Sequence, residues 1–360
     1  MPDIELTGDN AFYKQSNYLP DLSLKPIGHS KRPEPAYTWN TESKIWRIAK
    51  VVFAIIIFPV GLYWLLHSLA GKLIIPASSF CARSEKALDQ DRAKAFYSKI
   101  PTLPELSRGP YTPPIESEWK IKRICVEVDG YQIDAAIIGR ESTFGNKRWV
   151  LASNGNAEFY EDKLNNYSFK QFLTDLNGNA IVFNYPGTGA SSGMPNRSAM
   201  AKAYRTMLRF LEDKDNGLGA EEIISYSQSI GGGVEGDALL SHKLQEEIKY
   251  VFIKSRTFSD LSTTVSHMLY KPLGWLTRLL GWNMGSVESS KQLKAPEIVL
   301  QTVEGGRYID LSEKNKDKLV HDGVIPAEAT LALALLSQKD QFASNKLLIG
   351  ITDMHNAGVG

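Results

Sequence analysis

The sequence predicts an α/β fold, with a mostly parallel sheet of eight strands and helices on both of its faces. From about Ile121 onward, short runs rich in β-branched residues alternate with amphipathic stretches long enough to form helices. This alternation is typical of parallel strands joined by helical crossovers. The first two runs are close enough to pair as an antiparallel hairpin through Asp129-Gly130. The expected strands are residues 123–128, 133–138, 148–152, 180–184, 223–226, 251–253, 298–302 and 347–351.

Composition argues against several classes of function. The chain has 360 residues, enough for one large domain with appendages. Its 41 basic and 40 acidic side chains give a net charge of +1, so no overall field favours nucleic acid. The two cysteines, Cys81 and Cys125, suit a reducing compartment rather than a disulfide framework. The six histidines show no metal-ligand spacing, so we expect neither a metal nor another cofactor.

The chain divides into three regions by composition. Residues 1–45 are polar and rich in proline, which predicts a mobile tail. Residues 46–118 hold an apolar run, expected to be a hydrophobic helix, followed by a linker. Residues 119–360 carry the alternating pattern of the α/β domain.

The apolar run from Val51 to Gly71 carries no charged side chain and is just long enough to cross a bilayer. Basic residues precede and follow it, so it predicts membrane association. The alternative is a helix packed on the globular domain of a cytoplasmic protein. Pro59 and Gly61 would kink a spanning helix, and His67 is unfavourable in lipid.

Ser229 is the candidate nucleophile, because it stands between a strand and a helix. Ile223 and Ile224 belong to the preceding β-branched run, and the serine stretch opens a segment, Val234 to Leu240, that is expected to form a helix. Such a tight turn strains the serine backbone and requires small residues two positions before and after it, here Ser227 and Gly231.

Ser191 matches the G-x-S-x-G pattern to the letter, but its context differs. Pro186, Gly187 and Gly189 separate it from the preceding strand, and loop residues follow it. Ser229 is therefore favoured over Ser191.

Backbone amides at two places could stabilise an oxyanion. The N–H of Ile230 follows the nucleophile at the amino end of a helix. A glycine-containing turn, residues 153–157, follows the strand at 148–152, and the N–H of Asn156 is the second candidate, with Ala157 as its neighbour to consider. The alternative for this segment is an ordinary β-to-α turn.

Four motifs in sequence order resemble those of serine hydrolases of the α/β-hydrolase superfamily, over about residues 120–360. They are the oxyanion turn Asn154-Gly155-Asn156-Ala157, the loop 184–193, the elbow Ser227-Gln228-Ser229-Ile230-Gly231-Gly232 and the terminal Met354-His355-Asn356. The resemblance explains Ser191 as a loop serine. More narrowly, the hydrophobic lead-in together with this core resembles the SidB-type hydrolases of intracellular bacteria. That narrower resemblance implies delivery into a host cell.

The base is expected to be His355, which lies in a loop after a late strand, where the superfamily places its histidine. The superfamily also places an aspartate in the loop after the strand at 298–302, but ungapped matching puts a glycine there. Glu304 is the nearest carboxylate and the first choice, and Asp310 is the second. Asp260 is the third, because some members carry the acid after the preceding strand. The alternative for each is a surface carboxylate.

Residues 261–292 hold more apolar surface than a connection between two strands needs. They predict either a helical cap that forms an acyl pocket over the serine or crossover helices packed on the sheet.

These features predict a hydrolase of carboxylic esters or thioesters, with peptidase activity left open. Ser229 would attack the acyl carbon and His355 would remove its proton, with Glu304 orienting the imidazole. The expected partner is a small-molecule or lipid ester, with no nucleic acid, and the oligomeric state is open. The alternative is a weakly active or inactive hydrolase-fold protein that serves as a membrane-tethered binding or effector protein.

Overall fold

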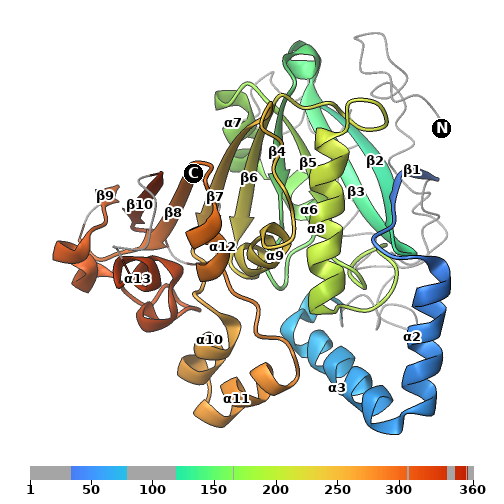
Figure 1. Cartoon of the computed structure of the whole chain (residues 1–360). Helices are drawn as coiled ribbons and strands as arrows, with labels where there is room; N and C mark the ends of the chain where they lie inside the picture. The colour runs from blue at the N-terminus through green and yellow to red at the C-terminus, as the bar shows by residue number, and fades with distance from the viewer. Residues whose placement is uncertain are drawn as a thin grey trace, which may run out of the picture.

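A computed structural model describes residues 34–78, 119–164, 166–305, 308–338, 345–353 and 355 (Figure 1). Residues 1–33, most of the expected tail, and residues 79–118, most of the expected linker, lie outside the described part.

The sheet holds ten strands in the described part of the chain, rather than the eight expected. Their order is β1-β2-β3-β5-β4-β6-β7-β8-β10-β9. The eight expected strands are present, and two short ones extend the sheet at its edges. β1 lies inside the segment expected to be a tail, and β9 has two residues. The strands are β1 Pro35–Trp39, β2 Trp119–Val128, β3 Tyr131–Arg140, β4 Arg148–Ala152, β5 Asn179–Phe183, β6 Glu222–Gln228, β7 Lys249–Ser255, β8 Glu297–Thr302, β9 Ile309–Asp310 and β10 Lys346–Ile351.

Strand directions agree with the predicted pattern. β2 and β3 form the expected antiparallel hairpin, and β3 also pairs antiparallel with β5. From β5 through β4, β6, β7 and β8 to β10, every pairing is parallel. The carboxyl ends of these strands therefore meet at one edge of the sheet, where α/β folds build their sites.

Helices cover both faces of the sheet, as expected. They are α2 Lys44–Ile56, α3 Phe58–Ile74, α6 Tyr160–Leu164, α7 Tyr167–Asp175, α8 Arg197–Glu212, α9 Ile230–Leu239, α10 Leu261–Met268, α11 Lys271–Leu279, α12 Val287–Gln292 and α13 Leu331–Leu336. Short 3-10 helices η4 Glu141–Asn146, η5 Glu313–Lys318 and η6 Ala327–Ala329 lie in connections.

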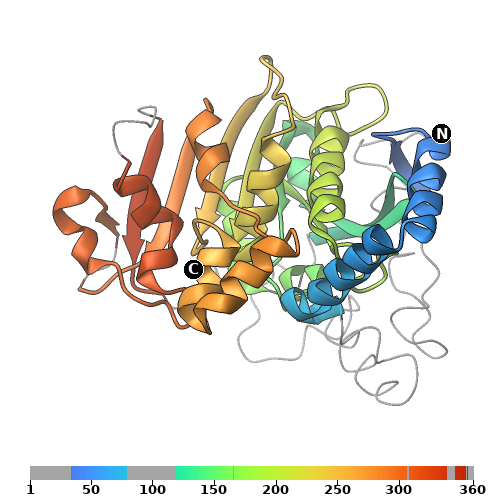
Figure 2. The same cartoon turned by 60° about the horizontal axis from the view of Figure 1, so that its bottom comes forward.

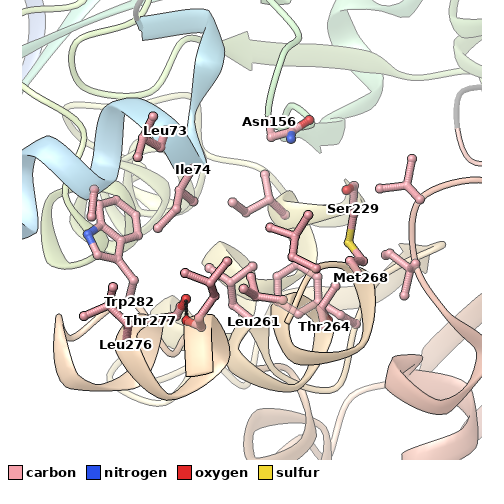
Figure 3. Close-up of a pocket in the computed structure, with 18 of the residues that line it drawn as sticks. Leu73, Ile74, Asn156, Ser229, Leu261, Thr264, Met268, Leu276, Thr277 and Trp282 are labelled. Atoms are coloured by element: carbon pink, nitrogen blue, oxygen red, sulfur yellow. Dashed lines mark hydrogen bonds between the residues drawn. The ribbon is translucent and has the colours of Figure 1, made fainter. Parts of the chain in front are cut away.

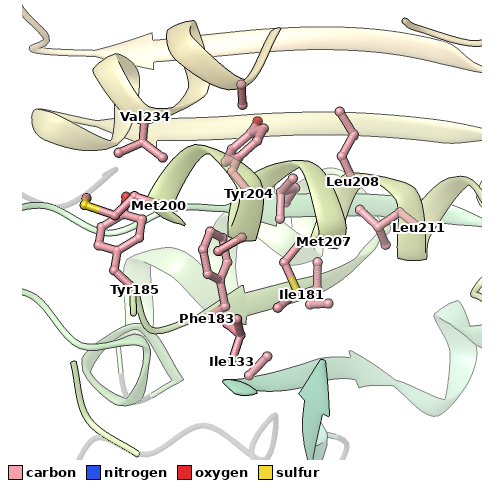
Figure 4. Close-up of a cluster of buried hydrophobic side chains, with 14 of the residues drawn as sticks. Ile133, Ile181, Phe183, Tyr185, Met200, Tyr204, Met207, Leu208, Leu211 and Val234 are labelled. Carbon is pink, nitrogen blue, oxygen red and sulfur yellow. The ribbon is translucent and has the colours of Figure 1, made fainter. Parts of the chain in front are cut away.

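Alternate residues of the central strands enter two separate cores. In β5, Ile181 and Phe183 pack with the α8 and α9 side chains, whereas Ala180 and Val182 pack with those of α6 and α7. Figure 4 shows the first core, where α8 lies across the strands. This period of two follows from the pleat of a strand buried on both faces.

The apolar run of the sequence forms two helices, so the single hydrophobic helix that we expected is corrected. α2 and α3 meet at Ile57 and are bent by 107° relative to each other. Pro59 stands in the first turn of α3, where proline is tolerated because an N–H at this position would have no acceptor inside the helix. In the described residues no single helix is both long and apolar enough to cross a membrane. The bent pair α2–α3, taken together, reaches that length and apolar composition.

α3 docks on the α/β domain through its last turns. His67 stacks on Trp282 with ring centroids 4.9 Å apart, and Trp282 Nε1 donates a hydrogen bond of 2.8 Å to the His67 carbonyl. The His67 ring nitrogen Nδ1 lies 2.6 Å from the Leu280 carbonyl. The histidine that is unfavourable in lipid therefore contacts protein.

Gly71 sets how closely α3 can approach. A β-carbon at this position would lie 2.5 Å from the Pro195 carbonyl oxygen and 2.7 Å from Trp282 Cζ2. We predict that Gly71→Ala forces α3 away from the domain and lowers the free energy of unfolding by about 1–3 kcal/mol. Chemical denaturation measures this loss, and hydrogen exchange of the α3 amides should rise. Gly145→Ala is the matched control, because nothing lies within 4 Å of its added carbon. Equal effects of the two substitutions would contradict the docking.

Candidate active site

Ser229 stands on the predicted strand–serine–helix turn. β6 ends at Gln228 and α9 begins at Ile230, so the serine alone makes the connection. Its backbone φ is 54°, in the left-handed region that a residue with a side chain adopts only under strain. Close packing holds it there. A β-carbon on Gly231 would lie 2.5 Å from Ser153 Oγ, and one on Gly232 would lie 2.4 Å from Thr257 Oγ1. The elbow geometry is confirmed.

A hydrogen-bonded cluster beneath the elbow explains why serine occupies position 227. The hydroxyls of Ser225 and Ser227 both donate to Glu235 Oε2, and Tyr204 donates to the same oxygen at 3.1 Å. All four side chains are buried. Burial raises the pKa of Glu235, while the charge of Lys254 and the two serine hydroxyls act in the opposite direction. Ser227 is thus small enough for the turn and also satisfies a buried carboxyl.

His355 connects Ser229 to a carboxylate. The histidine Nε2 lies 2.8 Å from Ser229 Oγ, and its Nδ1 lies 2.8 Å from Asp322 Oδ2. The backbone also fixes the pair, because the His355 N–H donates to the Asp322 carbonyl at 2.8 Å and Gln228 Nε2 donates to the His355 carbonyl at 2.8 Å. A serine, a histidine and an aspartate therefore form one buried chain of hydrogen bonds.

The carboxylate at His355 is Asp322, so the assignment of Glu304 is corrected. Glu304 is exposed, and its backbone N–H donates to the Lys318 carbonyl. Asp310, the second choice, is exposed in β9. Asp260, the third, caps α10 by accepting from the backbone N–H of Thr263 at 2.9 Å.

A detour in the chain hid Asp322 from ungapped matching. After β8 the chain leaves at Val303 and returns at Leu319, where these two residues form an antiparallel bridge. The detour carries β9 and η5. The N–H of Val320 then donates to the Thr302 carbonyl, so Asp322 lies just beyond the end of β8 in space. The signal in the sequence was Asp322-Gly323, a turn dipeptide ahead of an apolar pair.

Asp322 is held in its charged form. Burial acts to raise its pKa, but the hydrogen bond and charge of His355 and the backbone N–H groups of Ile325 and Val324 outweigh burial and hold the pKa below its usual value. These N–H groups donate to Oδ1 at 2.6 Å and 2.9 Å, which leaves Oδ2 for the histidine. A fixed carboxylate at Nδ1 selects the imidazole tautomer whose Nε2 can accept the serine proton.

The two residues predicted to supply oxyanion donors, Ile230 and Asn156, line the same pocket as Ser229. Ile230 is the first residue of α9. The N–H of a first helical residue has no acceptor carbonyl within its own helix. Asn156 lies in the turn after β4 and faces the same pocket as Ser229 (Figure 3). Glu158 fixes this turn, because its Oε2 accepts from the Gly155 N–H at 2.8 Å and from Lys163 Nζ at 2.9 Å.

Ser191 has a structural place in its loop. Its Oγ accepts from the Asp134 N–H at 2.9 Å and donates to the Asn184 carbonyl at 2.8 Å. These bonds tie the loop after β5 to β3.

An apolar pocket of about 380 Å³ opens beside Ser229. α3 forms one wall, and α10 with α11 forms the other (Figure 3). Residues 261–292 were expected to form either a cap or crossover helices. The part of this segment that forms α10 and α11 lies over the pocket beside Ser229. α12 instead packs on α9, where a β-carbon on Gly236 would lie 3.0 Å from Ser289 Oγ. The lining includes Ala70, Leu73, Ile74, Leu261, Val265, Leu273, Leu276, Leu280 and Ile325.

Within the described ranges, no group of three or more His, Cys, Asp or Glu side chains could hold a metal ion.

Solved structures that resemble this one include hydrolases and esterases. An α/β hydrolase of Vibrio vulnificus is 13% identical with a TM-score of 0.50, over 66% of this chain and 76% of that one. An esterase of Pyrococcus furiosus is 14% identical with a TM-score of 0.46, over 69% and 86%. An acetyl xylan esterase of Paenibacillus sp. R4 is 13% identical with a TM-score of 0.45, over 69% and 82%. At 13% identity the likeness to the Vibrio vulnificus protein concerns the fold alone, which is that of an α/β hydrolase.

No curated protein matches the chain by sequence. A family model described as Chlamydia CHLPS protein (DUF818) matches residues 27–359, nearly the whole length. The chain belongs to this CHLPS family.

Proposed function

We propose that this protein is a serine hydrolase that cleaves carboxylic esters or thioesters. The observation that carries the proposal is the chain of hydrogen bonds from Asp322 through His355 to Ser229. These residues occur in the order serine, acid, histidine, which is the order of the superfamily.

In the proposed reaction His355 Nε2 takes the Ser229 proton as Oγ forms a bond to the acyl carbon. The resulting oxyanion would lie against the N–H groups of Ile230 and Asn156, each worth roughly 3 kcal/mol of the barrier. The imidazolium, stabilised by Asp322, then gives its proton to the leaving alcohol or thiol. Water repeats these steps on the acyl-enzyme, with His355 as base, and releases the acid and free Ser229.

The pocket supports an apolar acyl group. Most of its lining is aliphatic, and Ser229 and Asn156 lie at one end of it. An acyl chain along α3 and α11 would bring its carbonyl carbon to the serine and leave the polar part of the substrate beyond it.

The best support for the alternative, a weakly active or inactive binding protein, was the glycine found where the superfamily has its aspartate. Asp322 removes that argument, because it occupies the position beside His355. The narrower resemblance to SidB-type hydrolases, and delivery into a host cell with it, stays a prediction.

Substitution of the two candidate serines separates their roles. We predict that Ser229→Ala abolishes both labelling by a fluorophosphonate probe and hydrolysis of a short soluble ester. Ser191→Ala should keep both, with a lower unfolding temperature because it removes two buried hydrogen bonds. Gel detection of the label and ester turnover measure the outcome. A folded Ser191→Ala protein without label, or a labelled Ser229→Ala protein, would contradict the assignment.

The acid is tested by Asp322→Asn. Its amide oxygen would accept from the Val324 and Ile325 N–H groups and turn the NH₂ group toward His355 Nδ1, which selects the tautomer that cannot accept the serine proton. We predict a loss of roughly 10⁴-fold in kcat.

The three carboxylates that were first considered as the acid serve as controls for Asp322→Asn. Glu304→Gln and Asp310→Asn change exposed side chains and should leave kcat within a factor of about two. Asp260→Asn should have little effect on kcat, because the new side chain also caps α10. Near-normal turnover of Asp322→Asn would show that the acid lies elsewhere.

A further inference from the structure

We infer that the α2–α3 bend and α11 together form a docking surface for a lipid bilayer and that the pocket opens at this surface. Lipid acyl esters would then enter sideways from the bilayer. The docking stands on its own, whereas the identity of the substrate rests on the proposed function.

The surface is made of apolar side chains that are exposed at an unusual density. α2 and α3 expose Ile45, Trp46, Ile48, Val51, Val52, Phe53, Ile55, Ile56, Phe58, Leu62, Tyr63, Trp64, Leu65, Leu66, Leu69 and Leu73. α10, α11 and the turn between them expose Met268, Leu269, Tyr270, Leu273, Trp275, Leu276 and Leu279. Exposed apolar patches of such extent mark interaction sites.

Two segments distant in sequence come together on this side. The stacking of His67 on Trp282 fixes α3 beside the end of α11. Figure 1 shows the α2–α3 bend and α11 along the same lower edge, and in Figure 2 α3 and α10–α11 lie side by side. The bend of 107° is incompatible with a straight span and suits helices that lie along an interface.

The charge of the surface has one sign. α2, α3, α10 and α11 contain no Asp or Glu, and exposed Lys44, Lys271 and Arg278 lie among their apolar residues. Anionic lipid headgroups complement this charge, and tryptophan and tyrosine favour the headgroup level. A second copy fits less well, because a twofold contact would bring basic patches together.

The pocket reaches this surface between α3 and α11. Leu73 of α3 and Leu276 of α11 both line the pocket and are exposed, Leu73 by 82% of its surface. An acyl chain that leaves the bilayer between these helices would meet mostly apolar side chains on its path to Ser229, with Thr264 and Thr277 as polar exceptions (Figure 3).

Docking is tested on full-length Ser229→Ala protein, so that the vesicles stay intact. The probes are phosphatidylcholine vesicles with and without phosphatidylglycerol. We expect the protein to co-sediment with both kinds of vesicle and to bind more tightly to those with phosphatidylglycerol. Binding should persist at high salt, because burial of apolar side chains is not screened.

Adding Phe58→Glu and Trp275→Glu should weaken vesicle binding at least roughly tenfold. Neither residue lines the pocket, and they are 72% and 65% exposed.

Tyr167→Glu is the matched control. Tyr167 is 64% exposed but belongs to α7, away from α2, α3 and α11 (Figure 1). The Tyr167→Glu substitution should leave vesicle binding unchanged. Thermal unfolding should show that all variants are folded. Absence of vesicle binding, or equal loss in the control and the double variant, would overturn the docking. A dimer in sedimentation equilibrium that the double variant dissociates, without vesicle binding, would identify a second copy instead.

The substrate is tested with the active serine. Wild-type protein should release fatty acid from the vesicles, and Phe58→Glu/Trp275→Glu should lose this activity while it keeps turnover of a soluble short ester. Turnover of the soluble ester together with docking but no release of fatty acid would overturn lateral entry. Failure on both substrates would overturn the proposed hydrolase and leave the docking result standing.

Discussion

The site depends on one close contact, the approach of the α9 amino end to the ends of β4 and β7. Gly231 and Gly232 have no room for side chains against Ser153 and Thr257, so α9 can start directly beneath the strand edge. That start holds Ser229 at a positive φ and makes Ile230, the next residue, the first of the helix. Thr257 also donates to the Ser229 carbonyl at 2.7 Å, so the neighbouring strand end fixes the strained peptide.

The ionic cluster behind the elbow shows how the domain supports that strain. Lys254 lies 2.7 Å from Glu297 and 3.8 Å from Glu235, and all three are buried. Removing Lys254 would take the nearest cation from both buried glutamates and leave Glu297 paired with Lys346 alone, at 3.2 Å, which is unfavourable away from water. The cluster therefore links β7 and β8 to α9 and holds the helix that carries the elbow. A glycine at position 227 would leave Glu235 with one hydroxyl fewer.

Local patterns were sufficient for the parts of the fold whose residues interact with close neighbours in sequence. The eight expected strands and the elbow at Ser229 could be predicted because period, turn chemistry and small flanking residues are local. Asp322 could not, because its position depends on a detour that closes through backbone pairing of Val303 with Leu319. β1 could not be predicted for a related reason. Its residues, Pro35–Trp39, become a strand by pairing with β2, more than eighty positions later.

The break at Ile57 changes the meaning of the hydrophobic run. A straight helix would present one continuous apolar cylinder, for which a bilayer span is the natural environment. The bend divides the run into α2, whose side chains are mostly exposed, and α3, which docks by Gly71 and His67 and lines the pocket with Ala70 and Ile74. One sequence segment thus supplies both an exposed apolar surface and a wall of the proposed substrate site. Because the same helix belongs to both, an event that shifts α3 at the surface must also change the width of the pocket beside Ser229.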